Sequence, residues 1–200
     1  MVKPASKSKS ATSGRNNQLR IIGGAYRRRI LSFPDGEGLR PTPDRVRETL
    51  FNWLGQEIPG WVCLDLFAGS GALGFEAASR GAARVVMVEQ ARPAVAALMA
   101  NRTLLQASAV EVVAADALSW LSRCATRFDL VFLDPPFASD YLPRVLGQLG
   151  PVLADEAYVY VETGHWPDAL PGWEVVREGK AGAVRYGLLR RQLDSGAVTA

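Results

Sequence analysis

The sequence predicts an α/β fold in which a mostly parallel sheet carries helices on both faces. From residue 61 onward, short apolar runs alternate with helical patterns, and this alternation is typical of parallel strands joined by crossover helices. The run Phe128–Leu133 is almost wholly apolar, as expected of a central strand that is buried on both faces. Near the end of the chain, Trp173–Glu178 and Val184–Arg190 predict an antiparallel hairpin at or near one edge of the sheet.

The elements of the main domain follow in order. Strands are predicted at Val62–Phe67, Arg84–Glu89, Val110–Ala114, Phe128–Leu133 and Tyr158–Glu162. Helices are predicted at Ala72–Arg80, Pro93–Leu105, Ala117–Arg123 and Tyr141–Leu149. Pro93 suits the first turn of its helix, where no backbone N–H is needed. With the two arms of the closing hairpin, which turns at residues 179–182, the strands form a seven-stranded sheet within a domain spanning residues 60–200.

A smaller extension over residues 19–59 precedes this domain. Leu19–Ile30 predicts a hairpin that turns at Gly23 and Gly24 and carries three arginines on its second arm. A loop over residues 32–39 leads to a helix that opens near Pro41, with Thr42 or Asp44 as its cap. Residues 1–18 are basic and rich in serine, and we expect them to form a disordered arm.

Composition narrows the class of protein. The two cysteines, Cys63 and Cys124, lie in apolar surroundings without metal-ligand spacing, so we expect a reduced cytoplasmic protein without a metal. No stretch approaches the roughly 18 consecutive apolar residues of a membrane span, and the basic N-terminus is not followed by the apolar region of a secretory signal. We expect a monomer that does not contact membranes.

Positive charge is concentrated at the front of the chain. Residues 1–47 carry a net charge of +8, whereas residues 48–200 carry −5. A basic front end on an acidic body indicates a polyanionic partner. Candidates for phosphate contacts are Arg20, Arg27, Arg28, Arg29, Arg40 and Arg45. For arginines 40, 45 and 47, salt bridges within the extension are an equally good interpretation.

A glycine-rich motif indicates where a cofactor binds. Gly69, Gly71 and Gly74 form a G-x-G-x-x-G pattern between a predicted strand and a predicted helix, where glycines allow a tight turn and close approach of a ligand to the backbone. Glu89 follows Gly69 by twenty residues and ends the next strand. Its carboxylate can accept hydrogen bonds from both hydroxyls of a ribose.

Two acids favour S-adenosylmethionine over a nicotinamide dinucleotide. Asp65 ends the strand before the glycine-rich turn, where a carboxylate repels a pyrophosphate and attracts a cation such as the amino-acid end of S-adenosylmethionine. Asp116 ends the third strand and can accept from an adenine amine while the Ala117 amide meets a ring nitrogen. Asp65 has an alternative role in ordering the turn through backbone amides, and Asp116 can be a helix N-cap.

The segment Asp134-Pro135-Pro136-Phe137 points to chemistry on the amino group of a base. Asp134 ends a central strand, where open α/β sheets bind their ligands. The prolines stiffen the chain into an extended turn, so the carboxylate of Asp134 and the Pro135 carbonyl become fixed acceptors for an exocyclic amine. Phe137 offers a stacking surface for a base that has left its stack. The alternative is an ordinary turn at the end of a strand.

Several motifs together resemble the RsmD family of bacterial 16S ribosomal RNA guanine-N2 methyltransferases. The residues that carry the resemblance are Arg20–Gly24, Leu39–Thr42, Asp44–Glu48, Leu50–Asn52, Leu64–Gly74, Arg80–Ala82, Glu89 and Phe128–Phe137. The sequence departs from the family's pattern in the basic arm before Leu19 and at 90–92, where another polar or acidic residue is expected.

The resemblance implies a Rossmann-like class I S-adenosylmethionine-dependent methyltransferase that acts on small-subunit ribosomal RNA, in assembled particles. We place the cofactor contacts at Asp65, Phe67, Gly69, Gly71, Glu89, Asp116, Ala117 and Thr42. Other interpretations remain open: an adenine-N6 methyltransferase acting on DNA or RNA, an NAD-dependent oxidoreductase, or a non-catalytic RNA-binding protein. The single histidine, His165, has no nucleophile near it in the sequence, which argues against histidine-based hydrolysis.

Overall fold

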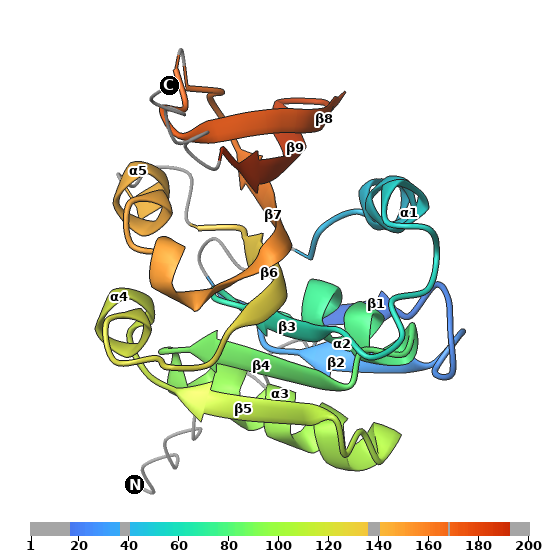
Figure 1. Cartoon of the computed structure of the whole chain (residues 1–200). Helices are drawn as coiled ribbons and strands as arrows, with labels where there is room; N and C mark the ends of the chain where they lie inside the picture. The colour runs from blue at the N-terminus through green and yellow to red at the C-terminus, as the bar shows by residue number, and fades with distance from the viewer. Residues whose placement is uncertain (1–16, 37–40, 136–140, 168, 193–200) are drawn as a thin grey trace, which may run out of the picture.

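The computed structural model describes residues 17–36, 41–135, 141–167 and 169–192 (Figure 1). Its strands are β1 (Asn17–Arg20), β2 (Ile30–Phe33), β3 (Val62–Asp65), β4 (Arg84–Glu89), β5 (Val110–Ala114), β6 (Phe128–Leu133), β7 (Leu153–Thr163), β8 (Trp173–Ala181) and β9 (Val184–Arg191). Its helices are α1 (Asp44–Trp53), α2 (Ala72–Ser79), α3 (Arg92–Leu105), α4 (Ala117–Leu121), α5 (Tyr141–Leu146) and the 3-10 turn η1 (Gly150–Val152).

Seven strands form the central sheet in the order β5-β4-β3-β6-β7-β9-β8. The strands from β3 to β7 pair in parallel, and β9 pairs antiparallel with both β7 and β8. The chain runs outward from β3 to β5 and then crosses to β6 on the other side of β3. Ligands of open parallel sheets bind at such a reversal, outside the carboxyl ends of the strands. The predicted seven-stranded, mostly parallel sheet with a closing hairpin is therefore confirmed.

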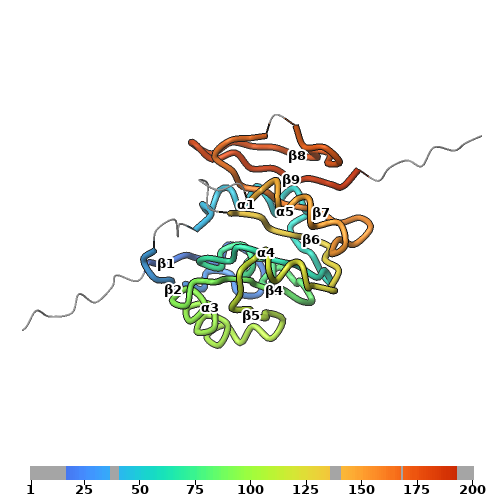
Figure 2. The backbone as a smooth tube through the Cα atoms, turned by 90° about the vertical axis from the view of Figure 1, so that its left-hand side faces the viewer, coloured from blue at the N-terminus to red at the C-terminus, as the bar shows by residue number. Residues whose placement is uncertain are grey.

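Helices cover both faces of this sheet. Figure 1 shows α4 and α5 on one side, with α1 and α2 on the other, and Figure 2 shows β1 and β2 outside the main sheet near α3. Asn101 on α3 fixes β2 in place, because its side chain donates to the Ser32 carbonyl at 2.9 Å and accepts from the Ser32 amide at 3.3 Å. The extension thus lies on the same side of the sheet as α2 and α3.

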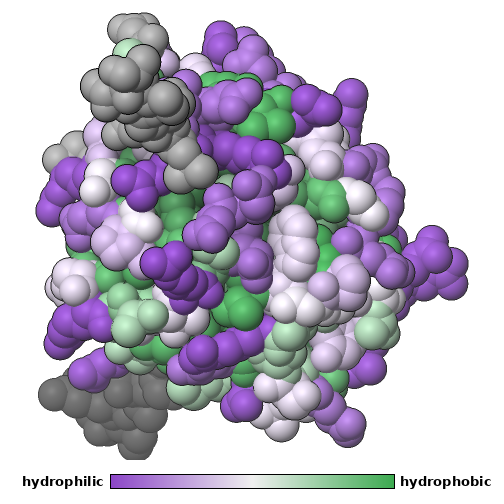
Figure 3. Space-filling view, viewed as in Figure 1, coloured by the Kyte–Doolittle hydropathy of each residue, from purple (hydrophilic) through white to green (hydrophobic). Residues whose placement is uncertain are grey.

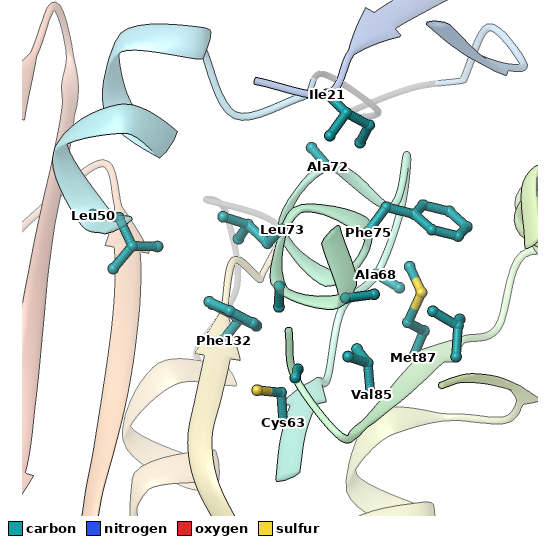
Figure 4. Packing of buried hydrophobic residues seen from close by; sticks show 14 of the residues in the cluster. Ile21, Leu50, Cys63, Ala68, Ala72, Leu73, Phe75, Val85, Met87 and Phe132 are labelled. Atoms are coloured by element: carbon teal, nitrogen blue, oxygen red, sulfur yellow. The ribbon is translucent and has the colours of Figure 1, made fainter. Parts of the chain in front are cut away.

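Two hydrophobic clusters fill the spaces between these layers. The larger cluster joins the extension to the main domain, because Ile21 and Leu50 pack in it together with Phe75, Met87 and Phe132 (Figure 4). The second cluster lies under α4 and α5. All eight residues of α2 are buried, since this helix has the sheet on one side and the extension on the other. The division at residues 59 and 60 into an extension and a domain remains a prediction.

A buried carboxylate on α2 anchors the extension. Glu76 is fully buried and accepts from the backbone amides of Ile22 and Gly23 at 3.0 and 2.8 Å. It also forms ion pairs with Arg47 on α1 at 3.0 Å and with Arg80 at 2.9 Å. Buried carboxylates normally require such partners. The salt-bridge interpretation within the extension is thus correct for Arg47, although its partners are Glu76 and Asp44.

Some predicted boundaries are wrong at the N-terminal side. Asn17 and Gln18, placed in the disordered arm, belong to β1, and the predicted loop at 32–39 starts too early because β2 continues to Phe33. Arginines 27–29 lie in the connection before β2, not on a strand. The connection is wide because it docks on the end of α2, where the Ala25 amide donates to the Ser79 carbonyl at 2.7 Å. A side chain at Gly24, whose φ is +71°, would overlap that carbonyl.

Smaller differences concern caps and lengths. The N-cap of α1 is Pro43, without a side-chain cap, so neither Thr42 nor Asp44 caps this helix. Strand β3 stops at Asp65, α4 and α5 end earlier than predicted, and β7 starts earlier, at Leu153. The closing hairpin turns over residues 182 and 183 alone. Asp116 is the N-cap of α4, which confirms the alternative interpretation of this residue.

Candidate active site

Four acids end four neighbouring strands of the sheet. Glu89 is the last residue of β4, Asp65 the last of β3, Asp134 follows β6, and Glu162 is the penultimate residue of β7. Parallel pairing of β4, β3, β6 and β7 brings their carboxyl ends to one edge. The structure therefore gathers three predicted site residues, with a fourth acid beside them, where an open sheet binds ligands.

The glycine-rich turn is held in shape by Asp65. This carboxylate is 2% exposed and accepts from the Gly74 amide at 2.9 Å, so the alternative role in ordering the turn is observed. Gly71 has a φ of +81°, and a Cβ there would come within 2.7 Å of Leu98 and Phe75. The turn therefore needs glycine at this position, both for its conformation and for its close packing.

Glu89 fixes the other side of the turn. Its Oε2 accepts from the Gly69 amide at 2.9 Å, and its Oε1 accepts from the Ala91 amide at 2.7 Å. Each carboxylate oxygen has a second lone pair, so Glu89 can still accept from the hydroxyls of a ribose. The side chain is half-buried, which leaves it accessible from the strand-end edge.

The remaining predicted cofactor contacts lie at the ends of β3 and β5. Asp116 is half-buried and accepts from the Ser119 amide at 2.9 Å, and this bond holds the pKa of Asp116 below its usual value. The adjacent Ala117 opens α4. Phe67 is half-buried after β3, and its ring meets the edge of Tyr141 on α5 at 5.5 Å between centroids. An apolar, aromatic wall of this kind suits a flat adenine ring.

Asp134 and Pro135 leave the sheet at the centre of the site. Asp134 is half-buried and Pro135 is buried. Burial raises the pKa of Asp134 well above its ordinary value, and the nearby carboxylates of Glu162 and Asp65 raise it further. Pro136 and Phe137, predicted as the rest of this motif, lie outside the described residues.

Glu162 is a site residue that the sequence interpretation missed. It is 3% exposed and accepts from the Tyr160 hydroxyl at 3.0 Å. Burial raises the pKa of Glu162, and the hydrogen bonds from the side chains of Thr42 and Tyr160 oppose this rise. The signal that could have found it is an acid at the end of an apolar run, since Tyr158–Val161 precedes Glu162 as Phe128–Leu133 precedes Asp134. Thr42 is buried and lies against this acid, and its predicted contact with the cofactor remains a prediction.

Acidic groups dominate this edge of the sheet. Burial, followed by the neighbouring Glu89 and Glu162, raises the pKa of Asp65 to about 7, against the opposing Gly74 hydrogen bond. The carboxyl groups of Asp65, Asp134 and Glu162, at adjacent strand ends, cannot all ionise without cost, because like charges in a poorly solvated site disfavour one another. The site therefore favours a cationic ligand and opposes a phosphate.

The predicted phosphate-binding arginines occupy the surface of the extension. Arg20, Arg27, Arg28, Arg29 and Arg45 are all exposed, and Arg40 lies outside the described residues. Arg20 pairs with Asp44 at 3.4 Å, and Arg29 donates to the Leu104 carbonyl at 3.0 Å. Figure 3 shows polar side chains over most of the viewed face, with apolar atoms in small separate areas.

Other features do not extend the site. A cavity of about 650 Å³ is lined by residues of α5, η1, the segment before β8 and the end of β9, and it contains none of the predicted site residues. Within the described ranges, no cluster of three or more histidine, cysteine or acidic residues could hold a metal ion. No helix in the same ranges is long and apolar enough to cross a membrane.

The sheet order and the site define a class I methyltransferase. The model of the family described as conserved hypothetical protein 95 matches residues 19–190. The chain is 46% identical to "Ribosomal RNA small subunit methyltransferase D" of Escherichia coli K12, over 88% of this chain and 92% of that protein. The chain therefore belongs to the RsmD family.

Solved structures agree with this assignment. A putative methyltransferase from Escherichia coli superimposes with a TM-score of 0.80 at 46% identity, covering 88% of this chain and 99% of that one. A putative SAM-dependent methyltransferase from Streptococcus mutans has a TM-score of 0.68 at 15% identity, covering 91% of this chain and 57% of that one. At that identity the second likeness concerns the fold alone.

Proposed function

We propose that the protein transfers a methyl group from S-adenosylmethionine to the exocyclic N2 amine of a guanine in small-subunit (16S) ribosomal RNA. The observation that carries the proposal is Asp134 with Pro135, a pair of hydrogen-bond acceptors at the end of a central strand beside the glycine-rich turn. Membership of the family supports the substrate. The reaction then takes place in the cytoplasm on assembled small subunits, with the protein acting as a monomer.

The residues present suit the proposed methyl donor. Glu89 offers its remaining lone pairs to a ribose, the acidic site around Asp65 favours a cationic amino-acid end, and Phe67 with Asp116 borders the place for adenine. Asp65 acts through the turn that it orders as well as through its charge. When bound, S-adenosylmethionine supplies an electrophilic methyl group on a positively charged sulfur.

The difficult part of the reaction is the nucleophile, because the lone pair of the guanine amine is delocalised into the ring. Hydrogen bonds from that amine to Asp134 and to the Pro135 carbonyl concentrate electron density on nitrogen and aim it at the methyl group. Asp134 then takes the proton that the nitrogen loses. The acceleration comes mainly from positioning and preorganised electrostatics, and Phe137 offers a surface on which the extruded base can stack.

The substrate class is tested by methyl transfer from labelled S-adenosylmethionine. Three samples are compared: small ribosomal subunits from cells that lack the modification, naked 16S RNA, and duplex DNA. We expect the small subunits to take up more label than either the naked 16S RNA or the duplex DNA. Preferential label in DNA would favour the adenine-N6 alternative, which shares the chemistry of Asp134.

Glu89 gives a prediction about cofactor affinity. Replacing Glu89 with glutamine removes a charged acceptor, and such hydrogen bonds contribute about 1.5–3 kcal/mol. We expect the dissociation constant for S-adenosylmethionine, measured by calorimetry, to rise by about 10- to 100-fold. The matched control is Glu111→Gln, which changes an exposed acid on β5. Equal affinity in the wild type and the Glu89 variant would refute this role.

The arginines give a prediction about RNA. Arg27 and Arg45 are exposed on the extension, and phosphate contacts of this kind provide affinity and register. The double variant Arg27→Ala/Arg45→Ala should bind small subunits more weakly, with the slope of log affinity against log salt reduced by about 0.7–0.9 per lost contact.

The control for the arginines is Arg123→Ala. Arg123 follows α4, on the opposite side of the sheet from the extension (Figure 1). The affinity for S-adenosylmethionine should stay unchanged in Arg123→Ala and in the double variant Arg27→Ala/Arg45→Ala. If the double variant keeps the wild-type salt slope, the extension does not contact phosphates through these two side chains.

The other classes of function have less support. An NAD-dependent oxidoreductase needs a pyrophosphate beside the glycine-rich turn, and the carboxylates of Asp65 and Glu89 oppose one there. A non-catalytic RNA-binding protein has no need of the costly burial of Asp65 and Glu162 at strand ends.

A further inference from the structure

Glu162 is a buried acid whose described partners include no cation. It is 3% exposed, and the hydrogen bonds that it receives come from the hydroxyls of Tyr160, at 3.0 Å, and Thr42. Buried carboxylates are usually paired with arginine or lysine, as Glu76 is in this protein. Hydroxyl donors stabilise a carboxylate without neutralising it, so Glu162 can hold a negative charge inside the site.

The sheet register brings this charge to Asp134. Leu133 of β6 pairs with Val161 of β7 in parallel, so the residues that follow, Asp134 and Glu162, lie side by side just beyond this pair. Burial is the main cause of the raised pKa of Asp134. Among the neighbouring charges, Glu162 raises this pKa more than Asp65 on β3 does. Tyr186 on β9 also adjoins Tyr160, with ring centroids 6.4 Å apart.

We propose that Glu162 is a positioning residue: it holds a fixed negative charge beside Asp134 and thereby makes Asp134 the acceptor of the proton released in methyl transfer. This inference rests on the proposed function. A nitrogen–carbon bond forms while the carbon–sulfur bond breaks, and the electron pair of that bond stays on sulfur, which becomes a neutral thioether. The N–H proton passes to Asp134, so the positive charge lost at sulfur reappears as that proton.

The charge of Glu162 favours transfer of the N–H proton to Asp134. While Glu162 is ionised, the electrostatic cost of a second carboxylate makes protonated Asp134 more favourable. Asp134 is therefore a stronger base than an isolated aspartate. Hydrogen bonds from Thr42, in the extension, and from Tyr160, on β7, stabilise the charged form of Glu162 while Asp134 takes up the proton.

The test replaces Glu162 with glutamine. Without the neighbouring charge, the pKa of Asp134 falls, so Asp134 ionises at lower pH. We expect the acid limb of the profile of kcat against pH to move to lower pH by on the order of one unit, with a lower plateau because the base is weaker. Glu162→Asp keeps the charge and should restore much of the wild-type profile.

Controls separate this role from a structural one. Glu156→Gln changes an exposed acid of the same strand, β7, and should leave the profile unchanged. A loss of packing alone would lower kcat at every pH without moving the limb. The inference would be overturned by a Glu162→Gln protein that folds and is active, but whose acid limb of kcat lies at the same pH as that of the wild type within experimental error.

A second measurement does not depend on turnover. The carboxyl carbon of Asp134 can be titrated by nuclear magnetic resonance, with Asp134→Asn to assign its signal. We expect a lower pKa of Asp134 in Glu162→Gln than in the wild type, and an equal pKa would overturn the inference. If the wild type methylated no guanine while this pKa still fell, the proposed function would fail and the coupling of the two acids would stand.

Discussion

Replacing Asp134 with alanine is expected to lower kcat for methyl transfer by at least about 100-fold, since positioned proton acceptors contribute about 10²- to 10⁴-fold. The alanine variant loses both the hydrogen bond that aims the amine and the group that takes its proton. The dissociation constant for the methyl donor should change little, because the proposed donor contacts lie on β3, β4 and β5. Single-turnover kinetics and calorimetry measure these two quantities separately.

Asp134→Asn refines this prediction. Asparagine keeps an accepting oxygen but cannot take a proton at neutral pH, so we expect a rate between those of the wild type and the alanine variant. The pKa of Asp134 is raised by burial, so ionising it costs stability as the pH rises through that pKa. The asparagine variant should therefore be at least as stable as the wild type at pH 8. Wild-type turnover in either variant would exclude Asp134 from the chemistry.

Replacing Glu76 with alanine is expected to lower the free energy of unfolding by about 3–5 kcal/mol, the usual cost of removing one partner of a buried ion pair. The change leaves the guanidinium groups of Arg47 and Arg80 buried without their shared acid. The amides of Ile22 and Gly23 also lose their acceptor. Urea unfolding should show the loss, and hydrogen exchange should be faster at these two amides.

The control for Glu76 is Glu48→Ala. Glu48 is exposed on α1, and exposed substitutions usually change stability by less than about 0.5 kcal/mol. Glu76→Gln keeps the shape of the side chain and removes its charge. Its free energy of unfolding should therefore lie between those of Glu76→Ala and Glu48→Ala. A Glu76→Ala protein as stable as the Glu48 control would mean that α2 does not anchor the extension through this acid.

Much of the site could be predicted because acids at strand ends have a simple sequence signal. Asp65, Glu89 and Asp134 each close an apolar run, and parallel pairing brings the ends of such runs together. The same rule applies to Glu162, but that acid lies in no motif that marks it as a site residue. Its proposed role comes from Asp134, which the sheet register places beside it, and from Thr42, which precedes α1.

The N-terminal extension was harder to predict because long-range contacts shape it. The local sequence of residues 19–30 favours a tight hairpin, whereas the connection between β1 and β2 widens to reach the Ser79 carbonyl at the end of α2. Arg28 adopts a φ of +70° there. The sequence favours a salt bridge of Arg47 within the extension, whereas Arg47 also pairs with Glu76, 29 positions later, in the core.

In the proposed function, the acceptor of the methyl group is the N2 amine of guanine. The most direct test is to digest the ribosomal RNA labelled by the wild-type protein to nucleosides and to identify the labelled nucleoside by mass spectrometry. We expect label in N2-methylguanosine, and at least about 100-fold slower labelling when Asp134→Ala replaces the wild type. Label in N6-methyladenosine or another methylated nucleoside would contradict it.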